Sequence, residues 1–185
     1  MRFTIPSAGG GSGKNDDEAK RRGTDAAPEP LGREHYHQIE AVLGYQFGDR
    51  SWLERALTHR SIQGKSNAKN DYERLEFLGD AVLDLAVAHL LLDAYPEARE
   101  GELSKMRAAL VNTQSLADVA RGLGLSPYIR LSRGELASGG SERPSILADV
   151  FEALMGAIYR EAGFGPALEC VQRHFGERLR DVAPT

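Results

Sequence analysis

The chain has 185 residues, of which 41% are hydrophobic and 27% are charged, and its net charge is −4 at pH 7. This mix is typical of a globular domain and excludes a collagen-like repeat, a pure coiled coil and a fully disordered chain. The acidic balance by itself argues against a nucleic-acid binder, because such proteins usually carry a basic excess. Cys170 is the only cysteine, so an internal disulfide is excluded. With no apolar run of about 20 residues and no signal peptide, we expect a cytoplasmic protein that makes no membrane contact.

Residues 1–33 are predicted to form a disordered tail. Glycine, serine, proline and charged residues dominate this stretch, and almost no large apolar residue lies between Ile5 and Leu31. The sequence from Ala8 to Asn15 nearly matches the phosphate-binding pattern G-x-x-x-x-G-K-S/T, but neither the first glycine nor the final hydroxyl residue is present. We interpret this stretch as a flexible linker and expect no nucleotide cofactor.

The remainder, residues 34–183, is predicted to form one all-α domain. Apolar residues recur at helical spacing, first around residues 39–43 and 52–57. Longer helices are predicted over residues 72–95, 103–123, 144–162 and 165–181, and glycine or proline follows most of these segments. No segment shows the strict alternation that is typical of a strand.

The predicted helix over residues 72–95 carries a narrow acidic stripe. At 100° per residue, four acidic residues fall within about 80° of arc. These residues are Glu73, Glu76, Asp80 and Asp84. The opposite side is apolar and contains Leu75, Leu78, Val82, Leu85 and Ala86.

The predicted helix over residues 144–162 repeats this design. Asp149 and Glu152 share one face with Gly156, and apolar residues cover most of the remaining surface. This helix should be buried nearly all round, and no basic residue lies between Leu147 and Tyr159. Burying unpaired carboxylates is costly, so divalent cations or basic groups from elsewhere must compensate them. Gly156 would allow another helix to approach closely.

Acids at this spacing on two apolar helices favour a metal site over an ordinary solvated face. Carboxylate oxygens suit the hard ions Mg²⁺ and Mn²⁺. Two such ions can hold the attacking and leaving oxygens of a phosphodiester. The residues alone therefore predict an acidic divalent-metal site in a helical domain.

Several sequence blocks resemble the ribonuclease III family. The stretch ERLEFLGDAVL at residues 73–83 is similar to the signature of that family. The resemblance continues, in order, through ALTHRS at 56–61, EGELSKMR at 100–107, RGE at 133–135 and ILADVFEAL at 146–154. It implies an all-helical endonuclease domain, over residues 34–183, that acts as a two-fold homodimer on double-stranded RNA. It also implies Mg²⁺ as the cofactor, with Mn²⁺ as a substitute, 5′-phosphate and 3′-hydroxyl products, and a role in ribosomal and messenger RNA processing.

The resemblance also implies roles for individual residues. The metal-binding carboxylates of the family fall on Glu76, Asp80, Asp149 and Glu152, and of these Asp80 and Glu152 are most closely tied to hydrolysis. Two further acids of the family pattern fall on Glu73 and Glu100. Candidate contacts to RNA phosphates are Lys105, Arg107 and Arg133. Phe77 corresponds to an aromatic knob that docks into the partner subunit.

Two alternatives remain open at this point. One is a non-catalytic ribonuclease III-like scaffold in ribosome assembly, which would be marked by the loss of a metal carboxylate, whereas all four are present. The other is an unrelated helical metal-dependent phosphohydrolase. Bacterial members usually continue into a double-stranded-RNA-binding domain, and this chain ends at Thr185, about where the linker to that domain would begin. We therefore expect RNA binding that is weak and sensitive to salt.

Overall fold

The computed structural model describes residues 31–63 and 70–182, and helices dominate both ranges. The α-helices are α2 (Arg33–Leu43), α3 (Arg50–Ala56), α4 (Arg60–Gln63), α5 (Glu73–Ala94), α6 (Glu100–Leu110), α7 (Thr113–Gly122), α8 (Arg133–Ala137), α9 (Pro144–Ala162) and α10 (Phe164–Asp181). Short 3₁₀ helices span η1 (Ser126–Tyr128) and η2 (Gly140–Glu142). The only β-type pairing among these residues is an isolated bridge between Thr58 and Arg130. The all-α prediction is confirmed.

The predicted tail falls almost entirely outside the described residues, and so does the glycine-rich stretch from Ala8 to Asn15. Within the described part, Leu31 packs against the core and α2 begins at Arg33. In the described ranges there is no helix with the length and apolar character that crossing a membrane requires.

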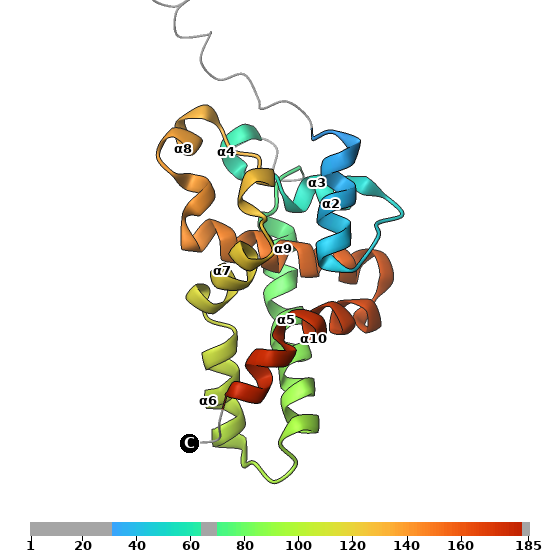
Figure 1. Cartoon of the computed structure of the whole chain (residues 1–185), viewed down its shortest axis with the longest axis vertical. Coiled ribbons are helices and arrows are strands. Elements are labelled where there is room, and N and C mark those ends of the chain that lie inside the picture. Colours follow the sequence, from blue (N-terminus) through green and yellow to red (C-terminus); the bar gives the residue numbers. More distant parts are fainter. Residues whose placement is uncertain (1–30, 64–69, 183–185) are drawn as a thin grey trace, which may run out of the picture.

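Two long helices, α5 and α9, form the centre of the molecule. Figure 1 shows α9 crossing α5, while α6 and α10 lie along the rest of α5. Helices α3 and α7 pack against α9. From Ile146 to Ile158, every residue of α9 is buried except Asp149 and Glu152. The prediction that this helix is buried nearly all round is therefore confirmed, and its two carboxylates are the only polar side chains of that stretch.

Two glycines allow α5 and α9 to touch backbone to backbone. A Cβ atom at Gly79 would overlap the main-chain oxygen of Glu152, and a Cβ atom at Gly156 would overlap the main-chain oxygen of Leu75. Any side chain at either position would push the helices apart. The close approach predicted at Gly156 is present, and Gly79 is its counterpart on α5.

One predicted helix is in fact two. The segment predicted over residues 103–123 divides into α6 and α7 at Asn112. The side-chain amide of Asn112 donates to the carbonyls of Ala108 and Ala109 at the end of α6, at 3.2 and 2.9 Å. Its side-chain oxygen accepts the Ser115 N–H, at 3.0 Å, and so caps the start of α7. The apolar periodicity continues across this junction, so periodicity alone concealed the break.

Leu85, on the apolar side of α5, is 56% exposed, whereas Leu75, Val82 and Ala86 on the same side are buried. Helix α5 is apolar around most of its circumference, and periodicity cannot tell which part of such a surface other helices of the same chain cover.

The glycine contact gives a direct test of the fold. We expect Gly156→Ala to lower the free energy of unfolding by about 3 kcal/mol or more, because overpacking here involves backbone that cannot repack. The matched control is Gly176→Ala in α10, where a Cβ atom meets nothing within 4 Å. This control should gain about 0.5–1 kcal/mol from its higher helix propensity. Urea unfolding measures both, and equal stability of the two variants would contradict the proposed contact.

Candidate metal centre

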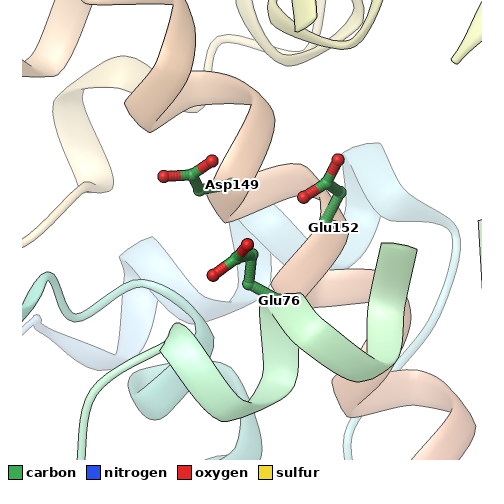
Figure 2. Close-up of side chains that lie close together, drawn as sticks. All are labelled: Glu76, Asp149 and Glu152. Carbon is green, nitrogen blue, oxygen red and sulfur yellow. The ribbon is translucent and has the colours of Figure 1, made fainter. Parts of the chain in front are cut away.

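Carboxylates from α5 and α9 meet at the crossing of these helices. One oxygen each of Glu76, Asp149 and Glu152 lies within 4.8 Å of the other two. Figure 2 shows Glu76 on α5 and the other two on α9, with all three carboxylates turned toward a common space. Each side chain is half-buried. We call these three residues the carboxylate cluster.

The backbone contact between the helices explains why these carboxylates converge. Gly79 lies against the main-chain oxygen of Glu152. Glu76 is one helical turn before Gly79, so its side chain lies on the same face and beside that of Glu152. Asp149 precedes Glu152 by three residues and lies one turn away on the same face of α9.

The cluster is strongly repulsive when ionised. Burial raises the pKa of Glu152 to about 8, and the negative charges of Asp80, Asp149 and Glu76 add to this shift. Burial likewise raises the pKa of Glu76, with further contributions from Asp149, Glu73 and Asp80. In the described ranges of the chain, no Arg or His forms a salt bridge with any member of the cluster, although the positive charge of Arg60 partly opposes the rise in the pKa of Asp149. The charges therefore call for a cation from outside the protein.

Tyr72 positions one member of the cluster. Its side chain is buried, and its hydroxyl donates to Oδ2 of Asp149 at 3.2 Å. The backbone N–H of Tyr72 donates to the carbonyl of Thr58, which fixes the start of α5 against the preceding loop. Burial raises the pKa of Asp149 in spite of the Tyr72 hydroxyl, which acts in the opposite direction. Sequence reasoning missed Tyr72, since no local pattern signals a contact with a residue so distant in the sequence.

A cleft of about 490 Å³ opens beside Glu76 and Asp149. It is lined by His59, Arg60, Ser61, Tyr72, Glu73, Glu76, Glu135, Arg143, Ser145, Ile146 and Asp149. The two arginines are paired, Arg60 with Glu73 at 2.9 Å and Arg143 with Glu135 at 2.5 Å. The cleft is thus polar and retains the negative charge of the cluster.

His59 presents a hydrogen-bond donor to this cleft. Its Nδ1 lies 3.1 Å from the backbone N–H of Ser61, which can only donate, so the proton of the neutral ring resides on Nε2. Burial lowers the pKa of His59, which keeps the ring neutral at pH 7. A ring whose acceptor nitrogen is already occupied has no free nitrogen to act as a general base.

Two predicted acids lie at the edge of the cluster. Asp80 is one turn after Glu76 on α5; it is exposed and lies outside the group of three close oxygens. Its charge nevertheless acts on Glu152. Glu73 lines the cleft, and its charge raises the pKa values of Glu76 and Asp149. The structure therefore brings three of the four predicted metal carboxylates together, with Asp80 beside them.

Glu100 lies elsewhere in the protomer. It begins α6 and lines a separate hollow of about 280 Å³ together with Leu91 and Leu92 of α5. Leu91 is 15 positions beyond Glu76, which corresponds to about 22 Å along the helix. The structure of one protomer thus does not bring Glu100 to the cluster.

The predicted RNA contacts also lie outside the cleft. Arg107 lines the same hollow as Glu100 and lies 3.8 Å from Asp84. Lys105 is exposed on α6, and Arg133 is exposed at the start of α8. Phe77, the predicted docking residue, is 81% exposed.

The carboxylate cluster fits a hard divalent cation. Its donors are all oxygens, they come from two rigid helices, and their mutual repulsion is relieved by positive charge. A bound ion of this kind would also have direct access to the cleft beside Glu76 and Asp149. The described residues therefore include a carboxylate cluster that could hold a metal ion.

Comparison with known proteins identifies the family of the chain. The family model described as Ribonuclease-III-like matches residues 49–179. Ribonuclease 3 of Bordetella avium is 50% identical over 146 residues, which cover 79% of this chain and 56% of that protein. Ribonuclease 3 of Pseudomonas aeruginosa is 48% identical over 147 residues, which cover 80% of this chain and 62% of that protein. The chain thus spans about three fifths of the length of these relatives.

Solved structures show the same fold. The nuclease domain of ribonuclease III from Campylobacter jejuni is 46% identical, with a TM-score of 0.71, and the match covers 77% of this chain and 94% of that domain. A second structure of that domain, 45% identical and also with a TM-score of 0.71, concerns structural flexibility in a region involved in dimer formation. Its match covers 80% of this chain and 98% of that domain. On the family match, the sequence identity and the shared fold together, the chain belongs to the ribonuclease-III-like family.

Proposed function

We propose that this chain is a metal-dependent endoribonuclease that cleaves double-stranded RNA, with residues 34–183 as the endonuclease domain. The observation that carries the proposal is the carboxylate cluster, which forms no salt bridge with an arginine or histidine of the described residues and opens into a polar cleft. Relatives named Ribonuclease 3, at 48–50% identity, support this assignment. The proposed substrates are ribosomal and messenger RNA precursors. A free, buried Cys170 is in keeping with the reducing cytoplasm.

The proposed cofactor is Mg²⁺, with Mn²⁺ as a substitute, held by Glu76, Asp149 and Glu152 together with Asp80. When bound, such an ion lowers the pKa of water and offsets the negative charge that develops on the phosphate. The reaction adds the oxygen of one water to phosphorus and breaks the bond to the 3′-oxygen. That oxygen leaves as a hydroxyl after receiving a proton, and the other strand end keeps the phosphate at its 5′ position.

The protein's own contribution is to hold charge and geometry. The cluster keeps its carboxylates fixed on two helices whose backbones are in contact, and Tyr72 orients Asp149. Of the four acids, Asp80 and Glu152 are the proposed catalytic residues. The His59 Nε2–H is available to an oxygen of the substrate in the cleft. Duplex RNA in such a cleft would be recognised by its shape and its 2′-hydroxyls more than by base sequence.

The cleavage test follows directly from the cluster. We expect Glu152→Gln to lower the rate of duplex cleavage at least about 100-fold, because one negative oxygen ligand is lost. The control, Glu177→Gln, removes an exposed carboxylate on α10 and should cut at the wild-type rate. The measurement is the appearance of short, 5′-phosphorylated fragments from a long RNA duplex at low salt, with Mg²⁺ and with chelator. A folded wild-type dimer that does not cut would contradict the enzyme and favour the scaffold.

The raised pKa of Glu152 predicts how stability depends on pH. Between pH 4.5 and about 8 the unfolded chain has released this proton, whereas the metal-free folded protein keeps it. The free energy of unfolding should therefore fall as the pH rises through this window and level off above it. The neutral side chain of Glu152→Gln should weaken this dependence and make the variant more stable than wild type at pH 8, by on the order of 1–2 kcal/mol after solvent screening.

Urea unfolding in chelator at pH 5 to 9 measures this effect, again with Glu177→Gln as the control. A Glu152→Gln variant with the pH dependence of the wild type would show that the cluster is not electrostatically strained.

We further propose that two copies associate through α5. Phe77, Leu85 and Leu92 are 81%, 56% and 59% exposed, and they lie within about 80° of arc on this helix. Leu92 borders the hollow against α6, which is otherwise lined by Ala88, Leu91, Glu100, Leu103, Ser104 and Arg107. An exposed apolar stripe of this length on a regular helix is typical of an interaction surface.

A two-fold contact would use both the exposed Phe77 ring and the hollow beside Leu92. If Phe77 occupies the hollow of the other protomer near its Leu92, then Leu85 lies close to the two-fold axis and meets its own copy. Glu100, which lines the hollow, would then lie beside the partner subunit's Phe77 and near its carboxylate cluster. The dimer would therefore explain why Glu100, an acid of the family pattern, lies far from the carboxylate cluster within one protomer.

Phe77 is the residue that tests this dimer. Since its ring is 81% exposed in the protomer, Phe77→Ala should leave the protomer folded while the dimer dissociates. Sedimentation velocity at micromolar concentration should show a dimer for the wild type and a monomer for the variant. Leu136→Ala, which removes a 55% exposed apolar side chain from α8, is the control and should remain dimeric. A wild-type monomer would contradict the proposal.

A further inference from the structure

A second polar hollow, of about 380 Å³, lies beside α3 and shares no lining residue with the cleft at the carboxylate cluster. It is lined by Ser51, Trp52, Glu54, Arg55, Thr58, Asn70 and Arg130. The two linings are neighbours in the chain, because Thr58 and Asn70 face this hollow while His59 and Tyr72 face the cleft. The two sites therefore lie on either side of the same short loop segments.

Two arginines line this hollow, and three more lie close to its lining residues or their neighbours. Arg55 and Arg130 line it directly, and the guanidinium of Arg160 lies over the Trp52 ring, 5.8 Å from its centroid. The full set, which we call the arginine cluster, is Arg50, Arg55, Arg74, Arg130 and Arg160. Two contacts connect its remaining members: Arg74 lies close enough for its charge to act on Arg55, and Arg50 lies over the ring of Tyr36, 5.7 Å from its centroid.

The charges of the arginine cluster are poorly compensated. Over the described ranges, none of its five members has a carboxylate oxygen within salt-bridge distance, whereas Arg60, Arg107, Arg121 and Arg143 all do. The nearby acids keep their charge but accept hydrogen bonds from groups other than these arginines. Glu54 accepts the Tyr36 hydroxyl at 2.6 Å, and buried Asp71 accepts the Glu73 N–H. In a chain of net charge −4, these positive charges are gathered in one place.

Two donors of the cluster are held in position without an anion partner. Nε of Arg130 is buried and has no hydrogen-bond partner, although Nη1 of the same side chain donates to Thr58 Oγ1 at 3.3 Å. Nε of Arg55 donates to the carbonyl of Asp71. Burial lowers the pKa of Arg55 and the charges of Arg74 and Arg160 lower it further, whereas the negative charge of Asp71 partly opposes this shift. Like charges held together carry a free-energy cost that a bound anion would relieve.

We propose that the arginine cluster binds a phosphate of the RNA backbone outside the catalytic cleft. Guanidinium groups match phosphate oxygens in a bidentate way, and the Ser51 hydroxyl and the Asn70 amide line the same hollow as further donors. Stacking on Trp52 holds Arg160 in place, so less rotamer freedom is lost on binding. This inference rests on the proposed function, since it takes duplex RNA as the ligand. It explains how an acidic protein can hold a polyanion whose scissile phosphate lies next to carboxylates.

The salt dependence of binding tests this assignment. Each phosphate contact that is lost should weaken duplex RNA binding and lower the slope of log Kd against log salt concentration by about 0.9. We expect this for Arg55→Gln and for Arg160→Gln, equally for RNA duplexes of unrelated sequence, measured by fluorescence anisotropy in chelator so that no cleavage occurs. Arg121→Gln is the matched control, because Arg121 is already paired with Asp118 at 2.9 Å, and its slope should equal that of the wild type.

The outcomes separate this proposal from the nuclease itself. Unchanged slopes for both variants, in folded protein that still cuts RNA with Mg²⁺, would overturn the phosphate site alone. Reduced slopes in a wild type that never cuts would support the site and contradict the nuclease. If inorganic phosphate raises the melting temperature of the wild type but not of Arg55→Gln, while the RNA slopes stay unchanged, the site takes free phosphate and the RNA assignment is overturned. Arg160 is exposed, so Arg160→Gln keeps the test valid if Arg55→Gln does not fold.

Discussion

The contact between the backbones of Gly79 and Gly156 is the constraint on which the rest of the structure depends. It sets the distance between α5 and α9, and this distance decides whether carboxylates from two helices can share one ion. Larger residues at the crossing would separate the helices by the width of a side chain, and Glu76 would then lie apart from Glu152. Because the contact involves backbone atoms, neighbouring side chains cannot absorb an error in it.

The packing of α9 in the core also causes the electrostatic repulsion within the carboxylate cluster. Buried apolar residues surround Asp149 and Glu152 on α9, so their charges are poorly solvated and their pKa values are raised. Such a cluster lowers the stability of the metal-free protein, and the rest of the core has to offset this cost. Such a cluster also selects among cations. A divalent ion that prefers oxygen ligands offsets more of the repulsion between the carboxylates than a monovalent ion does.

Much of this site could be predicted from the sequence, because the acids repeat at helical spacing within apolar segments. That pattern identified Asp149 and Glu152, the burial of α9 and the close approach at Gly156, and it placed Glu76 within a stripe of four acids from which the family resemblance selected it. It could not identify Tyr72 or the arginine cluster, whose contacts join residues from distant segments. It also failed at Asn112, where one residue ends α6 and begins α7, and it could not show that Leu85 remains uncovered within one protomer.

The placement of the charged residues explains how a protein with a negative net charge could bind RNA. A net charge of −4 argues against a nucleic-acid binder only if the charges are spread evenly. Here acids converge at the crossing of α5 and α9, where a divalent ion would reverse their effect on an approaching phosphate. The arginine cluster lies around α3, and the segments 58–59 and 70–72 separate it from the cleft. Its arginines form no salt bridges within the described residues, so they need no metal ion to attract other phosphates of the RNA backbone. Metal would therefore govern attraction at the cleft, whereas the arginine cluster would attract RNA with or without it, and binding and cleavage become separable properties of one small domain.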